Sequence, residues 1–207
     1  MSVLARVLDP TTFGAVFVTL FVIMDPLGSI PLFLGLTAGR TNRARARLSW
    51  QAVLVSLAVI SVFAVLGQQI LGYLGIGIPA LQGAGGLLLA IVALELLTDK
   101  QDDPSEVDNV NVALVPLGTP LLAGPGAIVA TIVFVKQAEH VSQFVAIAAG
   151  ILAVHASVYL SLRFSVVITR VVREAGIVLL TRISGLLLSA IAVQLVADSV
   201  RGFVQGL

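Results

Sequence analysis

Two short clusters of proline and glycine interrupt apolar stretches that are otherwise long enough to be membrane-spanning helices. The first cluster covers residues 25–31 and the second covers residues 119–127. Proline removes a backbone donor, and glycine weakens a helix entropically. Within a bilayer, broken helix is tolerated only where protein or a water-filled cavity covers the freed backbone groups. Two breaks at corresponding positions of two halves are typical of a transporter binding site.

Composition sets the class of protein. The chain is 58% hydrophobic and only 11% charged, whereas soluble domains carry about a quarter charged residues. We therefore expect an integral membrane protein surrounded by lipid bilayer. The formal net charge of +1 gives no reason to expect a nucleic-acid partner. The sequence has no cysteine and two histidines, which excludes disulfides, thiolate catalysis and histidine-cluster metal sites.

The apolar stretches predict an all-α fold with six transmembrane segments. Each is long enough to cross a bilayer, which takes about 20 apolar residues. The first and fourth segments carry the breaks, and they are either broken through-spans or re-entrant hairpins. The segments are approximately residues 12–38, 50–72, 79–98, 111–136, 142–164 and 177–199.

The distribution of lysine and arginine predicts the orientation, because cytoplasmic loops carry an excess of positive charge. With six spans, nine of the twelve basic residues fall on one side, and we expect that side to be cytoplasmic and both termini to lie outside. The nine are Arg40, Arg43, Arg45, Arg47, Lys100, Arg163, Arg170, Arg173 and Arg182.

An internal repeat divides the chain. Residues 86–96 resemble residues 185–195 at an offset of 99 residues, and the same offset aligns Asp25-Pro26 with Gly124-Pro125. We therefore expect repeats at residues 1–99 and 111–207, joined by an acidic cytoplasmic linker at residues 100–110. Three spans in each half make the repeat inverted, so the broken elements can meet near the midplane.

Stripes of small residues follow the third span of each half. They let helix backbones approach closely, which favours a packing role because lipid provides little hydrophobic drive for helix association. The stripes are Gly86, Ala90 and Ala93 in the first half, and Gly185, Ser189 and Ala192 in the second.

Asp25 is the most informative single residue. It lies near the middle of an apolar span, where a carboxylate is costly unless it is paired, solvated or protonated. One interpretation is a ligand for a substrate ammonium, a sodium ion or a proton. The other is an N-cap for a helix that starts with Pro26. Both roles are compatible.

The helix restarts after the breaks are candidate sites for a substrate carboxylate, since a helix start presents unpaired N–H groups and a positive dipole end. Alternatively, the glycines only let two helices cross closely. The candidate substrate-binding residues are Asp25, Gly28, Ser29, Thr119, Gly124, Gly126 and Ala127, with the Ile128 amide as a further donor.

Two further ionisable residues are candidates for ion coupling beside Asp25. Glu95 lies near the end of the third span, where it either lines a water path or reaches the headgroups. His155 begins a stripe with Tyr159 and Arg163 on one face of the fifth span. That stripe either relays protons or consists of a structural His–Tyr hydrogen bond with Arg163 at the interface. Trp50 suits an interfacial anchor.

Enzyme signatures are missing from the sequence. It contains no P-loop, metalloprotease motif or nucleophile elbow. We therefore expect neither catalysis nor a cofactor, apart from coupling to a sodium ion or proton.

The two breaks carry a family resemblance. Residues 25–33 resemble the Asp-Pro-x-Gly-x-x-Pro-x-Phe signature of the MarC family, and residues 120–128 resemble its second signature. The glycine- and leucine-rich third span is also similar. The resemblance covers essentially the whole chain.

This resemblance implies a multi-pass protein of the bacterial or archaeal cytoplasmic membrane that transports small neutral amino acids such as alanine or glycine. Its partner would be a small zwitterionic solute, and a homo-oligomer is left open. The alternatives are a non-transporting or stress-associated membrane protein, or an exporter of drugs or metabolites. The last fits less well, because only 6% of the residues are aromatic.

Overall fold

The computed structural model describes residues 8–98 and 122–205, and all regular structure in these two ranges is helical. This confirms the all-α prediction. The elements are α2 (Pro10–Met24), α3 (Ser29–Leu36), α4 (Asn42–Leu74), α5 (Ile78–Thr98), α6 (Pro125–Gln137), α7 (Val141–Arg163) and α8 (Ser165–Gln205).

Four helices are long and apolar enough to cross a membrane: α4, α5, α7 and residues Ala175–Gln205 of α8. The pair α2 and α3, bent by 47° at the first proline–glycine cluster, makes a fifth candidate. The predicted break in the first segment is thereby confirmed. Helix α6, with 13 residues, is too short to span alone. The predicted fourth segment begins outside the described residues. The acidic linker and Thr119 also lie outside them.

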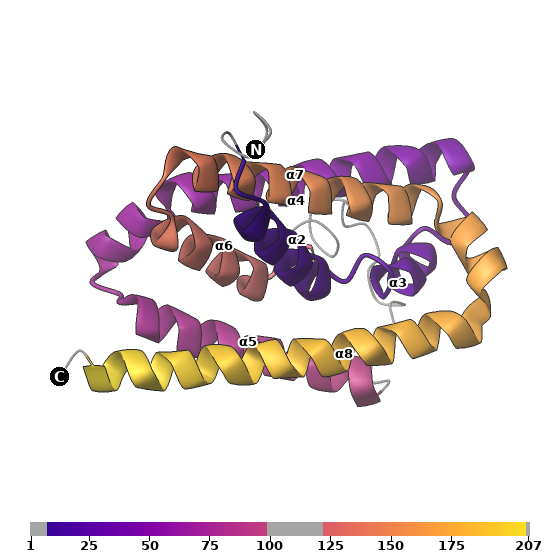
Figure 1. The fold of residues 1–207 in the computed structure, drawn as a ribbon. Helices are drawn as coiled ribbons and strands as arrows, with labels where there is room; N and C mark the ends of the chain where they lie inside the picture. Colours follow the sequence, from indigo (N-terminus) through magenta and orange to yellow (C-terminus); the bar gives the residue numbers. More distant parts are fainter. Residues whose placement is uncertain (1–7, 99–121, 206–207) are drawn as a thin grey trace.

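The last helix differs from its predicted bounds. The sequence predicted a span at residues 177–199, but α8 runs continuously from Ser165 to Gln205 and follows α7 after one residue, Phe164. The first turns of α8 contain basic residues, so the prediction from hydropathy assigned these turns to a loop. Figure 1 shows α8 starting beside the end of α7 and then running along α5.

The helices form three layers (Figure 1). Helices α4 and α7 pack together on one side, and α5 and α8 form the most extensive helix pair on the other. The shorter helices α2, α3 and α6 lie between these pairs, with α2 against α7 and α6 against both α4 and α5. The broken elements therefore occupy the centre of the molecule.

The apolar side chains are distributed as expected for a protein in lipid. A buried cluster that includes Leu20, Phe33 and Leu188 joins the layers. The outward faces of the long helices are also apolar: Val65 is 69% exposed and Leu186 is 64% exposed. Water would disfavour so extended an apolar surface, whereas hydrocarbon accommodates it.

The start of α2 shows how a helix begins at the edge of the apolar region. The Asp9 side chain accepts hydrogen bonds from Thr11 N (3.1 Å) and Thr12 Oγ1 (2.6 Å), and Pro10 follows at the first helical position. The Thr12 hydroxyl, more than the backbone amides, lowers the pKa of Asp9. A charged N-cap of this kind satisfies helix donors that would otherwise lack partners.

The predicted packing role of the small-residue stripes is confirmed at two glycines. A Cβ atom on Gly86 would lie 2.8 Å from Ala192 O, and one on Gly185 would lie 3.3 Å from Ala93 O. Backbone of one helix thus lies directly against backbone of the other. This contact explains why α5 and α8 form so long a seam.

We predict that Gly86→Val weakens the α5–α8 pair. The added side chain would meet the Ala192 carbonyl, which cannot move aside as a flexible side chain does, and overpacking of this kind costs about 1–3 kcal/mol. Thermal unfolding in detergent measures the loss. Gly72→Ala in α4 is the matched control, because nothing lies within 4 Å of its added Cβ, and it should not lower the midpoint. Equal midpoints for Gly86→Val and the wild type would show that the seam tolerates a side chain.

Candidate functional site

Asp25 lies where α2 ends, and its side chain is only 8% exposed. Its Oδ1 accepts hydrogen bonds from Gly28 N at 3.2 Å and from Ser184 Oγ of α8 at 3.0 Å. Its Oδ2 is buried and has no hydrogen-bond partner in the part of the chain that the structure describes. The described residues therefore satisfy Oδ1 of the carboxyl group and provide no partner for Oδ2.

The capping role predicted for Asp25 is wrong in its details. Asp25 is the C-cap of α2, in the left-handed conformation with φ 37° and ψ 72°, and it is not the N-cap of the following helix. The residue before a proline is pushed out of the helical conformation, which ends α2 at this point. A turn over residues 26–28 then separates Asp25 from α3, which begins at Ser29.

Gly28 and Ser29, the two residues predicted to contact a ligand beside Asp25, both take part in the structure of the break. A Cβ atom on Gly28 would collide with the Asp25 carboxylate, so only glycine lets that carboxylate reach the Gly28 amide. The Ser29 hydroxyl donates to Asp25 O at 2.8 Å, and Met24 O lies 3.4 Å away. Asp25 O also accepts from the Ser29 amide at 3.0 Å, so this carbonyl group has two donors within the break.

Helix α6 begins at the second break. Gly124 is the N-cap of α6, and Pro125 is the first residue of this helix. The amides of Ala127 and Ile128, which we predicted as donors to a ligand, both donate to Gly124 O, at 3.0 and 3.2 Å. A Cβ atom on Gly126 would collide with the Leu89 side chain of α5, so this glycine brings α6 close to α5.

Both breaks border one buried core. Met24 precedes the first break, and Leu122, Ala123 and Ala127 lie within the second; all four belong to the same apolar cluster. Glu95 does not belong to this region, since it lies on an exposed face of α5. In the described residues, no group of three His, Asp or Glu side chains is placed to hold a metal ion.

His155 of α7 forms a second buried polar pair. Its Nδ1 lies 2.7 Å from Ile151 O and its Nε2 lies 3.1 Å from Ser56 Oγ of α4. A carbonyl only accepts, so Nδ1 carries a proton, and in the neutral ring Nε2 accepts from the Ser56 hydroxyl. The predicted His–Tyr hydrogen bond is wrong, since Tyr159 packs edge-on against Trp50, with ring centroids 5.7 Å apart.

Two site residues were missed from the sequence: Ser184 and Ser56. Ser184 immediately precedes Gly185 of the second small-residue stripe, and Ser56 stands 99 residues before His155, which is the offset of the predicted repeat. The predicted repeat therefore held a signal for Ser56, and the stripe held one for Ser184. A serine in an apolar helix otherwise attracts little notice.

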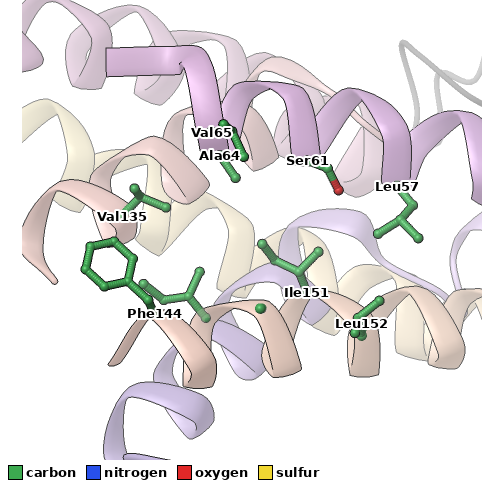
Figure 2. Close-up of a pocket in the computed structure, with 10 residues that line it drawn as sticks. Leu57, Ser61, Ala64, Val65, Val135, Phe144, Ile151 and Leu152 are labelled. Atoms are coloured by element: carbon green, nitrogen blue, oxygen red, sulfur yellow. The ribbon is translucent and has the colours of Figure 1, made fainter. Parts of the chain in front are cut away.

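A cavity of about 520 Å³ lies between α4, α6 and α7 (Figure 2). Its walls are almost entirely apolar, with Ser61 as the one hydroxyl among the residues that line it. Val65 and Leu152, which line it, are more than half exposed, so the cavity opens on the outer apolar surface. It offers no charged group to a zwitterion and is not the site described above.

Comparison with known proteins identifies relatives over nearly the whole chain. The family described as MarC family integral membrane protein matches residues 11–204. A UPF0056 membrane protein of Methanocaldococcus jannaschii is 33% identical over 94% of this chain and 98% of its own length. One from Archaeoglobus fulgidus is 35% identical (90% of this chain, 91% of its own). YhcE, a UPF0056 membrane protein of Escherichia coli, is 31% identical (92% and 93%). No solved structure shows a significant match.

We predict that Gly28→Ala displaces the Asp25 carboxylate. The added methyl group would occupy the position of that carboxylate and break its hydrogen bond to the Gly28 amide, and an unsatisfied buried group costs about 1–3 kcal/mol. Thermal unfolding in detergent measures this. Gly14→Ala in α2 is the control, because its Cβ would have nothing within 4 Å. If both variants unfold at the wild-type temperature, the carboxylate does not depend on Gly28.

Proposed function

Since the chain belongs to the MarC family of integral membrane proteins, we propose that it is a secondary transporter of small neutral amino acids, coupled to protons or sodium ions. The proposed site lies at Asp25, between the two broken elements. The ammonium group or the coupling ion would bind the carboxylate of Asp25. The start of α6 would receive the substrate carboxylate.

The observation that carries this proposal is the buried Oδ2 of Asp25, which has no hydrogen-bond partner among residues 8–98 and 122–205. A charged carboxylate inside a membrane costs about 3 kcal/mol or more when nothing compensates it. Two hydrogen bonds hold Oδ1, and they orient the group without neutralising it. The remaining oxygen needs a proton, a metal cation or an ammonium group, and each of these is a species that an amino acid transporter moves.

The second break supplies the complementary partner. Helix α6 starts directly at the Gly124-Pro125 pair, and a helix start favours a negative group. The Gly126 amide is the donor we retain there, because the amides of Ala127 and Ile128 already bond to Gly124 O. Thr119, which lies outside the described residues, remains a proposed hydroxyl ligand.

Contacts at the repeat offset support the proposed 3+3 inverted repeat. Helix α4 begins at residue 42 and α7 at residue 141, an offset of 99 residues. Ser56 and His155 have the same offset and contact each other. Where two equivalent residues of a repeat touch, they lie on the symmetry axis that relates the copies.

The α5–α8 seam supports the same axis. Gly86 faces Ala192, and Gly185 faces Ala93. Each residue of the first contact is 99 residues from its equivalent in the second, which is the reciprocal pattern of a two-fold interface. An inverted repeat places a site between its halves, and rocking of one half against the other then exposes that site to alternate sides.

His155 fits ion coupling through its position on this proposed axis. Its neutral ring accepts the Ser56 hydroxyl at Nε2, which is also where a proton would bind. A protonated ring would donate to Ser56 instead, so the bond between α4 and α7 would persist with reversed polarity. Glu95, on an exposed face of α5, remains a weaker candidate.

We predict that Asp25→Asn abolishes gradient-driven accumulation but leaves the protein folded. Asparagine keeps an oxygen that accepts from Gly28 and Ser184, and it removes the charge. Uptake into proteoliposomes across a panel of amino acids, with an imposed pH or sodium gradient, measures accumulation. Asp198→Asn is the control, because Asp198 lies on α8 in an exposed hydrogen bond to Gln194.

Counterflow separates the two roles of Asp25. Retained counterflow in Asp25→Asn assigns the carboxylate to ion coupling, and lost counterflow assigns it to substrate contact. Accumulation at the wild-type level would refute the site. A wild-type protein that moves no amino acid under any gradient would instead favour a non-transporting membrane protein.

We also propose a cytoplasmic-membrane location with both termini outside, from the loop charges. The chain has no native cysteine, so single introduced cysteines report their side cleanly. Ala44 and Tyr73 lie at opposite ends of α4, and the test uses the variants Ala44→Cys and Tyr73→Cys. In intact cells, a membrane-impermeant maleimide should label Cys at position 73 at once and at position 44 only after permeabilisation. The reverse pattern would invert the topology.

A further inference from the structure

Three helix ends meet at one end of the molecule and enclose a second cavity. The start of α4, the end of α7 and the start of α8 come together there (Figure 1). The cavity measures about 340 Å³, and its lining includes Asn42, Arg45, Arg163 and Ser165. Two arginines from different helices therefore line one pocket.

A hydrogen bond from its Nε atom positions Arg45. Arg45 Nε donates to Thr37 O at 3.3 Å, which ties the start of α4 to the end of α3. The two terminal nitrogens of Arg45 take no part in this bond. Arg163 lies with its guanidinium carbon 5.6 Å from the centre of the Phe164 ring. A guanidinium presents several donors in a plane, which suits the oxygens of a phosphate group.

The other wall of the pocket is apolar and outward-facing. Phe164 is 48% exposed, Val166 is 40% exposed and Val167 is 55% exposed. They lie on the first turn of α8 and its immediate approach, next to Arg163. A positive group directly beside exposed apolar side chains matches the boundary between headgroups and acyl chains. A freely soluble anion would gain nothing from these side chains.

The geometry points to a binding site for an anionic phospholipid, with its phosphate between Arg45 and Arg163 and an acyl chain along Phe164, Val166 and Val167. Basic pockets between transmembrane helices on the cytoplasmic side are typical sites for such headgroups. In the proposed orientation this pocket lies on the cytoplasmic side. The site rests on the lining of the pocket and on the proposed orientation, and it does not depend on the transport proposal.

Lipid titration of the purified full-length protein in a non-ionic detergent tests this site. Phosphatidylglycerol should bind, as measured by native mass spectrometry, and phosphatidylcholine should bind more weakly. Arg163→Gln should weaken phosphatidylglycerol binding about fivefold, and Arg45→Gln with Arg163→Gln roughly thirtyfold. Arg170→Gln is the matched control, because Arg170 is an exposed arginine of α8 outside the pocket, and it should bind as the wild type does.

Two results would overturn the inference. Wild-type phosphatidylglycerol affinity in the single and double variants would show that the pocket does not hold the lipid. Inorganic phosphate that competes as well as phosphatidylglycerol at equal concentration would show a site for a free anion. The single variant Arg163→Gln leaves the hydrogen bond from Arg45 to Thr37 in place, so a loss of affinity in this variant is not caused by loss of that bond. Arg163→Lys keeps the positive charge and should restore part of the affinity.

Discussion

Hydrogen bonding of the backbone at the break after Met24 is the constraint on which the rest of the structure depends. Hydrocarbon offers no water to free amide and carbonyl groups, so each must find a partner in the protein. The Asp25 amide still donates to Phe21 O, at 3.1 Å. The Ser29 hydroxyl donates a hydrogen bond to Asp25 O, and the Asp25 carboxylate accepts one from the Gly28 amide. A carboxylate thus lies in the core as part of the break.

Close packing of the neighbouring helices follows from the same constraint. The break bonds to α8 through Ser184, and α8 is held against α5 where glycines let backbone meet backbone. Lipid gives little drive for helices to associate, so small residues and interhelical hydrogen bonds have to supply it. Gly28 and Gly86 are glycine for one reason, since neither position has room for a Cβ atom.

Two long-range hydrogen bonds between side chains join helices among the described residues: Asp25 with Ser184 across two layers, and Ser56 with His155 within the layer of α4 and α7. Each joins helices far apart in the sequence, and each lies in an apolar setting where polar groups are costly. Under the proposed function, the first pair orients the binding carboxylate. In the proposed inverted repeat, the second pair would lie where the two halves meet, so motion of one half against the other would leave it near the centre of rotation.

The sequence by itself determined the class of protein, the helical fold, the position of the break in the first segment and the presence of a carboxyl group within it at Asp25. These follow from local chemistry: apolar run length, proline and glycine in a helix, and a charge at membrane depth. It did not determine the partners. That Ser184 bonds Asp25, that Ser56 bonds His155 and that Gly126 packs on Leu89 depend on distances between helices, which no local rule supplies. Tertiary structure decided which amides already have acceptors and which carboxylate oxygen has no partner within the part of the chain that the structure describes, because hydrogen-bond satisfaction is a property of the packed molecule.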